Sequence, residues 1–279
     1  MKFNRILSAA LAAALCLSLA ACGKKEEAPQ QEAAEPQELV VFAAASLTET
    51  LTELSEKYEA EHEGVTILCN FDSSGRLKTQ IEEGAECDLF ISAGQKQMNQ
   101  LDAAADAEKN PDGLDFVDSA SRVDFLENKV TLAVPEGNPK NITGFDQLAE
   151  LLASGEVLLC MGNGDVPVGQ YTQKILAFYG LNEEELANAG KITYGSNVKE
   201  VTTQVSENSV DCGVIYCTDA FSAGLTVVDT ARAEQCGQVI YPAAVMKNSQ
   251  NAELSADFLA YLRTEESMGV FEAVGFAAP

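Results

Sequence analysis

The sequence predicts an α/β protein built as two lobes, and two observations carry that prediction. Short, continuously apolar runs alternate with segments of helical periodicity along most of the chain, as in mainly parallel sheets covered by helices on both faces. The alternation stops at a loop-rich stretch with a clear turn, Asn110-Pro-Asp-Gly113, and restarts at Asn128. Two successive sets of units favour two lobes over one long sheet.

The N-terminal segment has the composition of a leader followed by a tether. Lys2 and Arg5 precede an apolar run of 16 residues, 6–21, which is short for a membrane span and suits a signal-peptide core. The run ends in Leu-Ala-Ala-Cys22, which resembles a bacterial lipobox. This resemblance implies a signal peptide over 1–21, lipid attachment at Cys22 and an extracytoplasmic, membrane-anchored protein. The alternative is an ordinary secretory signal with an incidental cysteine.

Residues 22–37 are predicted to be a flexible tether. They contain prolines and many charges but no aromatic or β-branched residue, so they cannot bury enough apolar surface to offset the entropy of ordering them. The folded part is therefore expected to begin at about residue 38.

Strand and helix patterns alternate through the folded part. The first set comprises a strand over 40–44, a helix carrying Leu47, Leu51, Leu54 and Tyr58, a strand over 65–70, a helix carrying Leu77 and Ile81, and a strand over 88–92. The second set comprises strands over 129–134, 157–160, 212–216, 227–228 and 239–245, and helices over 145–152, 168–179, 198–205, 252–262 and 265–274.

Charge and cysteine content argue against a nucleic-acid partner and against a zinc site. The net charge is −25, and removal of residues 1–21 takes away two positive charges and no negative one, leaving −27, which argues against a nucleic-acid partner. The folded part holds Cys69, Cys87, Cys160, Cys212, Cys217 and Cys236 without a CxxC pair, and the single histidine, His62, lies in a polar run. No zinc site is therefore predicted, and the pairing of the cysteines stays open.

Four junctions between a strand and the following helix carry the functional signal. Ser46, expected to cap its helix, opens the first, and Ser73 and Ser74 open the second. The third is the glycine-rich stretch 162–171, with Pro167 suited to a first helical turn, and the fourth is 194–198. Helix N-termini bind anions through unpaired amides and a partial positive charge. Each serine could merely cap its own helix, but four such junctions in both lobes favour convergence on an anionic ligand.

Together these motifs resemble the molybdate-binding proteins of ABC importers. The motifs are AAASL at 43–47, FDSSGRLKTQI at 71–81, CDLFISA at 87–93, GDVPVGQY at 164–171, NVKEV at 197–201 and GVIYCTDA at 213–220. They occur in that family's order and at compatible spacing, and the resemblance covers nearly all of residues 38–279.

The resemblance implies a type II periplasmic-binding-protein fold, with two lobes and two hinge crossovers. Lobe I is expected to comprise 38–127 and 241–279, and lobe II 128–240, each with a mainly parallel sheet flanked by helices. The crossings are expected near 127–135 and 239–246. The implied protein is a monomer that delivers its ligand to an ABC permease and its ATPase.

The resemblance also implies which residues hold molybdate, and with it tungstate. They are the hydroxyls of Ser46 and Ser74 in lobe I, the backbone amides of Val168 and Val198 in lobe II, and the hydroxyl of Tyr216. The metal is held as an oxyanion, with no directly coordinated metal ion and no cofactor. Arg76 departs from the family pattern, and it either adds a charge to anion capture or points to solvent.

Other functions remain as alternatives. Within binding proteins, the ligand could be sulfate, phosphate or ferric ion, although iron would require paired tyrosines and carboxylates. An enzyme, specifically a serine hydrolase, is the rival class. The sequence has no GxSxG elbow, so a hydrolase would have to rely on a pair such as Ser74 and Lys78.

Overall fold

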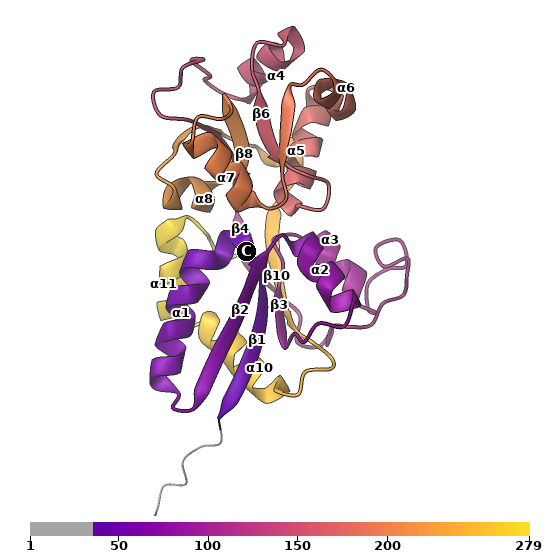
Figure 1. The fold of residues 1–279 in the computed structure, drawn as a ribbon. Coiled ribbons are helices and arrows are strands. Elements are labelled where there is room, and N and C mark those ends of the chain that lie inside the picture. The colour runs from indigo at the N-terminus through magenta and orange to yellow at the C-terminus, as the bar shows by residue number, and fades with distance from the viewer. Residues whose placement is uncertain (1–35) are drawn as a thin grey trace, which may run out of the picture. The chain divides into compact units, whose positions relative to one another are not determined.

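The computed structural model describes residues 36–279, in which two five-stranded sheets form the cores of two lobes (Figure 1). The predicted signal peptide, Cys22 and all but the last two residues of the predicted tether lie outside the described residues. The first strand begins at Gln37, slightly earlier than expected.

The sheet of lobe I has the strand order β2-β1-β3-β10-β4. Residues of β1 pack to both sides of this sheet: Val41 lies in the same apolar cluster as Leu51, and Phe42 lies in a second cluster with Leu77. Burial on both faces explains why β1 is a continuous apolar run. The strands are β1 (Gln37–Ala44), β2 (Val65–Asp72), β3 (Leu89–Ile91), β4 (Val123–Asn128) and β10 (Val239–Val245).

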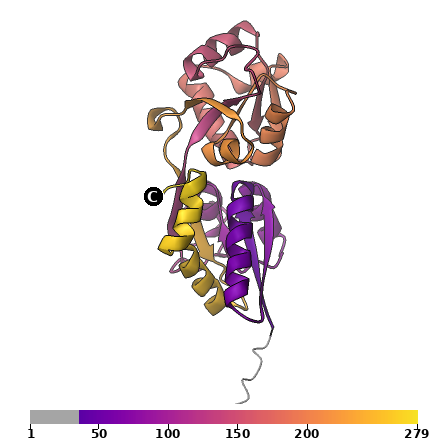
Figure 2. The ribbon, with the colours of Figure 1, turned by 90° about the vertical axis from the view of Figure 1, so that its left-hand side faces the viewer.

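Helices cover both faces of this first sheet. The spacing of Leu51, Leu54 and Tyr58 puts these side chains on one side of α1, where they are buried together with Leu47 of the preceding turn, at about 1.5–3 kcal/mol for each fully buried leucine. The two C-terminal helices return to pack beside α1 (Figure 2). The helices of lobe I are α1 (Thr48–Glu61), α2 (Ser74–Glu82), α3 (Gln95–Leu101), α10 (Ala252–Leu262) and α11 (Glu265–Val274).

The sheet of lobe II has the order β7-β6-β8-β5-β9. Its strands are β5 (Val130–Val134), β6 (Leu159–Gly162), β7 (Ile192–Gly195), β8 (Cys212–Tyr216) and β9 (Thr226–Thr230). Its helices are α4 (Phe145–Ser154), α5 (Pro167–Phe178), α6 (Glu183–Asn188), α7 (Val198–Ser206), α8 (Cys217–Ser222) and α9 (Ala233–Cys236).

Each sheet contains one reversed strand, so both sheets are mixed. In lobe I, β10 runs antiparallel to β3 and β4, while β1 pairs in parallel with β2 and β3. In lobe II, β5 runs antiparallel to β8 and β9, while β6 pairs in parallel with β7 and β8. The reversed strands are those that enter a lobe from the other one. The chain passes from β4 to β5 through Lys129 alone, and it returns along β10.

The two-lobe α/β fold is confirmed, but several elements were not predicted. They are β4, β7, α3, α6, α8 and α9. Most are short or polar: α6 has the sequence EEELAN with a single buried residue, Leu186, and β4 reads VDFLEN. Such elements carry too few apolar positions for a periodicity to be recognised.

An ion-pair cluster joins the two lobes. Lys199, in the first turn of α7, places its Nζ 2.8 Å from Glu49 Oε2 of α1 and 3.2 Å from Asp219 Oδ1 of α8. Asp219 is 1% exposed, and within residues 36–279 neither of its carboxylate oxygens has a hydrogen-bond partner. Burial raises the pKa of Asp219 to about 6, and attraction to Lys199 offsets only part of that effect. The free-energy cost of burying the Asp219 carboxylate is thus only partly offset by its ion pair with Lys199.

We predict that Asp219 makes the protein less stable as the pH rises. Because its pKa is raised on folding, its stabilising contribution is fully present below about pH 4 and is lost as the pH rises through about 6. Relative to wild type, Asp219→Asn should therefore gain about 2 kcal/mol in free energy of unfolding between pH 4 and pH 7. Urea denaturation followed by circular dichroism at several pH values measures this difference.

The matched control is Asp257→Asn, at an exposed aspartate on α10. A difference between Asp219→Asn and wild type that stays constant across this pH range would show that Asp219 titrates as in the unfolded chain.

Candidate functional site

All five predicted ligand residues line one small pocket between the lobes. Its cavity volume of about 10 Å³ is roughly the space of one water molecule, far below the usual range of roughly 300–1,000 Å³ for drug-sized ligands. A space this small excludes an organic ligand of that size. Its lining consists of Ala44, Ala45, Ser46, Asp72, Ser73, Ser74 and Ala93 from lobe I, and Val166, Pro167, Val168, Val198 and Tyr216 from lobe II.

The pocket lies where strands end and helices begin. Figure 1 shows the strands and helices whose ends meet between the two lobes. In lobe I, β1 ends at Ala44, and β2 is followed by α2. In lobe II, β6 and β7 are followed by α5 and α7, and Tyr216 ends β8. The first amides of a helix have no intrahelical partner, so this arrangement directs unpaired N–H groups toward one space.

Two of these amides belong to the predicted residues Val168 and Val198. Pro167 begins α5, as predicted, which makes Val168 the second residue of that helix, and Val198 is the first residue of α7. Gly169 allows α5 to begin close to β6, because a Cβ at this position would lie 2.2 Å from the carbonyl oxygen of Gly162. Both valine side chains are buried, so their amides are shielded from bulk water.

Ser46 does not cap a helix, so that part of the prediction is wrong. It lies inside a single 3₁₀ turn, Ala45–Leu47, which separates β1 from α1 and has no side-chain cap. The hydroxyl of Ser46 instead forms a 2.8 Å hydrogen bond with the hydroxyl of Tyr241 on β10. Because α1 begins only at Thr48, the amides that Ser46 was expected to cap lie beyond its reach.

Ser74 is oriented by a backbone amide of its own lobe. The amide of Ala93 donates a 2.9 Å hydrogen bond to Ser74 Oγ, so the hydroxyl proton is free to point into the pocket. Its neighbour Ser73 caps α2, by accepting a hydrogen bond of 3.4 Å from the amide of Arg76. The two serines therefore have separate roles, with one oriented toward the pocket and the other holding the helix start.

Tyr216 presents a protonated hydroxyl to the pocket. Its hydroxyl donates a long hydrogen bond of 3.5 Å to the carbonyl oxygen of Ala93, across the two lobes. At this length the bond is weak and easily exchanged for a better acceptor. Burial raises the pKa of Tyr216 well above its ordinary value, so the hydroxyl remains a donor.

The only carboxylate among the lining residues, Asp72, already accepts hydrogen bonds from three donors. Its Oδ1 accepts hydrogen bonds from the amide of Ser73 at 2.7 Å and from Asn197 Nδ2 at 3.2 Å, and its Oδ2 faces Arg76 Nη1 at 3.3 Å. The side chain of Arg76 is 55% exposed and is not part of the lining. The guanidinium of Arg76 therefore pairs with Asp72 and does not face the pocket.

Backbone contacts bring the lobes together beside the pocket. A Cβ added at Gly75 of α2 would lie 2.2 Å from the carbonyl oxygen of Asp165 in lobe II. Asn197, which caps α7, reaches across to Asp72. These contacts flank Ser74 and Val198, so in this arrangement donors from both lobes face one space.

Sequence reasoning missed Tyr241, Asn197 and the role of Ala93. Tyr241 lies in the apolar run VIYPAAV, which gives no indication of a polar contact. Ala93 acts through its backbone, which a side-chain motif does not reveal. Asn197 was part of a quoted motif, and its helix-capping residue type was the available signal.

The side chains invoked by the rival functions have other partners. Lys78 Nζ is 2.7 Å from Glu82 Oε1, and His62 Nδ1 is 2.8 Å from the carbonyl oxygen of Tyr58, whose ring it stacks on. Among residues 36–279, no group of three or more His, Cys, Asp or Glu side chains is placed to hold a metal ion. No disulfide joins the six cysteines of this region, and none of its helices has the length and apolarity needed to span a membrane.

The chain matches known proteins over almost its whole length. The pattern of a family described as bacterial extracellular solute-binding proteins matches residues 39–277. A Bacillus subtilis protein named as an ABC transporter substrate-binding lipoprotein, YvgL, is 33% identical over 99% of both chains. The molybdate-binding protein ModA of Escherichia coli is 32% identical, covering 85% of this chain and 88% of ModA.

A solved structure has the same fold. The substrate-binding domain of a molybdenum ABC transporter from Clostridium difficile superposes with a TM-score of 0.62 at 30% identity, over 87% of this chain and 99% of that domain. The members of this family are solute-binding proteins and not enzymes. The two-lobe fold and these matches together show that the chain belongs to the family of bacterial extracellular solute-binding proteins.

Proposed function

We propose that this protein captures molybdate, and with it tungstate, in the pocket between its lobes and delivers it to an ABC permease. The observation that carries the proposal is the composition of the pocket. Four hydroxyls, of which that of Ser73 caps α2, and two helix-terminal amides line it, and the carboxylate of Asp72 already has its own donors. Donors without a free acceptor suit an oxyanion that carries no proton.

Such a site can hold a dianion without a cationic side chain. Hydrogen bonds to a charged acceptor are roughly twice as strong as neutral ones, and the amides of Val168 and Val198 are also at the positive ends of helix dipoles. Molybdate, tungstate and sulfate are fully deprotonated at neutral pH. Phosphate retains a proton and would require an acceptor, so it fits less well.

Size favours molybdate and tungstate over sulfate, which is the second candidate. The amides are fixed on helices, and the oxygens of Ser46 and Ser74 are each held by a partner, so the donors cannot follow a smaller ion inward. The names of the relatives from Escherichia coli and Clostridium difficile agree with this preference.

Lipid attachment at Cys22 belongs to the same proposal. It rests on the Leu-Ala-Ala-Cys22 sequence, and it agrees with the name of the Bacillus subtilis relative as a lipoprotein. The anchored protein would hold its ligand outside the cytoplasmic membrane. Closure of the lobes around the ion would then produce the form that a permease with its ATPase recognises.

We predict that loss of the Tyr216 or the Ser74 hydroxyl weakens molybdate binding. Tyr216→Phe and Ser74→Ala each remove a hydrogen bond to a charged acceptor, worth about 1.5–3 kcal/mol, so the affinity should fall about 10- to 100-fold. Isothermal titration calorimetry measures the affinity, and circular dichroism shows that the variants are folded.

Tyr58→Phe is the matched control, because Tyr58 is buried in lobe I and does not line the pocket. Unchanged affinity in both Tyr216→Phe and Ser74→Ala would show that the ligand binds elsewhere.

We predict that Gly75→Ala weakens molybdate binding without lowering the unfolding temperature. Alanine is favoured over glycine in helices by up to about 1 kcal/mol, so the unfolding temperature should stay the same or rise slightly. The new Cβ would collide with the carbonyl of Asp165, so the closed form should be lost and the molybdate affinity should fall more than about tenfold.

The matched control is Gly269→Ala in α11, where an added Cβ meets nothing within 4 Å. If Gly75→Ala binds molybdate as tightly as Gly269→Ala does, the contact with Asp165 is not required for binding.

Competition between oxyanions tests the identity of the ligand. For the chain without residues 1–22, molybdate and tungstate should displace each other at similar concentrations, and sulfate should require a much higher concentration. Phosphate should be weaker still at neutral pH. Calorimetric titration of each ion, alone and in competition with molybdate, checks this order. Tighter binding of sulfate than of molybdate would show that the ligand is sulfate.

A further inference from the structure

We infer that Tyr241, held by Asn128, is a positioning residue that directs the proton of the Ser46 hydroxyl into the pocket. The inference rests on the proposed function, because the directed proton requires an anionic acceptor there. Neither Tyr241 nor Asn128 lines the pocket, so each acts only through Ser46.

Three buried groups form the chain of contacts. Tyr241 Oη is 2.8 Å from Ser46 Oγ and 3.2 Å from Asn128 Nδ2. Ser46 is 5% exposed, Asn128 2% and Tyr241 0%, so water has little access to these hydrogen bonds. Buried polar groups of this kind need a partner for every donor, which restricts the direction in which each proton can point.

The orientation of the Asn128 amide is fixed by its neighbour. The backbone amide of Lys129, which can only donate, lies 2.8 Å from Asn128 Oδ1. The oxygen of the side chain must therefore face Lys129, and the nitrogen must face Tyr241. The hydroxyl of Thr218, which accepts a 3.0 Å bond from the same nitrogen, is consistent with this orientation.

The proton count then determines the remaining bonds. Tyr241 Oη accepts the hydrogen bond from Asn128, and the acceptor for its own proton is Ser46 Oγ at 2.8 Å. The hydroxyl of Tyr216 lies nearby and its pKa is raised by burial and in part by Tyr241, but it donates to Ala93, and among residues 36–279 it forms no hydrogen bond of 3.5 Å or less with Tyr241. Burial raises the pKa of Tyr241, so this proton is retained. If Ser46 donated to Tyr241 instead, the tyrosine proton would be buried without an acceptor. With Tyr241 as the donor, the proton of Ser46 is left to point into the pocket.

The second serine of the pocket has the same arrangement by a different route. Ser74 Oγ accepts a hydrogen bond from the amide of Ala93, a group that can only donate. In both serines a fixed donor occupies the oxygen and the proton remains for the ligand. Tyr241 thus does for Ser46 what the backbone amide of Ala93 does for Ser74.

A thermodynamic cycle tests the inference. Molybdate affinity is measured by calorimetry for wild type, Tyr241→Phe, Ser46→Ala and the double variant. Phenylalanine keeps the ring contacts with Tyr216 and Phe276, whose centroids lie 5.7 and 5.4 Å away, so the fold should be preserved. Tyr241→Phe should lower the affinity about three- to tenfold when Ser46 is present and less than about twofold in the Ser46→Ala background.

Each outcome has a distinct meaning. Equal losses in both backgrounds would indicate that Tyr241 has a merely structural role and would overturn the inference while leaving the proposed function intact. Absence of oxyanion binding by the wild type would overturn both. Tyr58→Phe, which removes another buried tyrosine hydroxyl in lobe I, is the control and should leave the affinity of either background unchanged.

Discussion

The structure depends on one constraint, which is that the pocket presents donors and no cation. For the proposed oxyanion ligand, donors without a cation must be held in place, because flexible donors would not offset the cost of removing an ion from water. The fold meets this requirement by ending strands and starting helices of two sheets at the same place. Val168 and Val198 then contribute main-chain groups, which have no rotamers to lose. The hydroxyls of Ser46 and Ser74 are held in place as well, because the oxygen of each is already hydrogen-bonded to a partner within lobe I.

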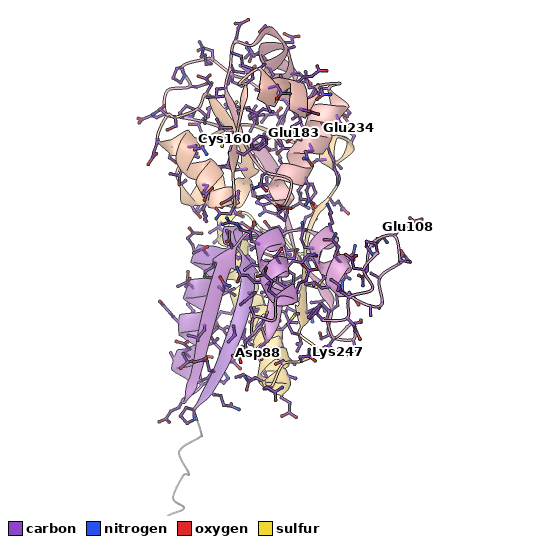
Figure 3. The ribbon with its side chains drawn as sticks, turned by 45° about the vertical axis from the view of Figure 1, so that its right-hand side comes forward. Asp88, Glu108, Cys160, Glu183, Glu234 and Lys247 are labelled. Carbon is purple, nitrogen blue, oxygen red and sulfur yellow. The ribbon has the colours of Figure 1, made fainter. Side chains whose placement is uncertain are left out.

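The acidity of the chain does not conflict with such a site. Acidic residues such as Glu108, Glu183 and Glu234 lie on outer loops and helices (Figure 3), and none of them lines the pocket. Their field is screened over about 10 Å at 0.1 M salt, whereas the donors act at contact distance. Asp72, the carboxylate in the pocket lining, is bound to donors from both lobes, and the buried charge of Asp219 is partly offset by its ion pair with Lys199.

The correct predictions from the sequence concern features that follow from local patterns along the chain. Apolar runs and helical spacing located the main strands and helices, and the junction motifs named five residues that the structure brings to one pocket. Sequence reasoning failed where the outcome depends on distant contacts. Ser46 was expected to cap a helix because nothing local reveals that Tyr241, on a strand far along the chain, reaches its hydroxyl. Short polar elements such as α6 were missed because their positions are set by their neighbours rather than by their own pattern.

The contact between Gly75 and Asp165 has a consequence for how selectivity could change during evolution. It joins main chain to main chain, so no side chain can rotate to let the lobes approach further. Under the proposed function, the minimum separation of the lobes, and with it the radius of the ion that all proposed donors can touch at once, is set outside the ring of donors. Altering this contact would then change ion preference while every proposed ligand residue stays the same.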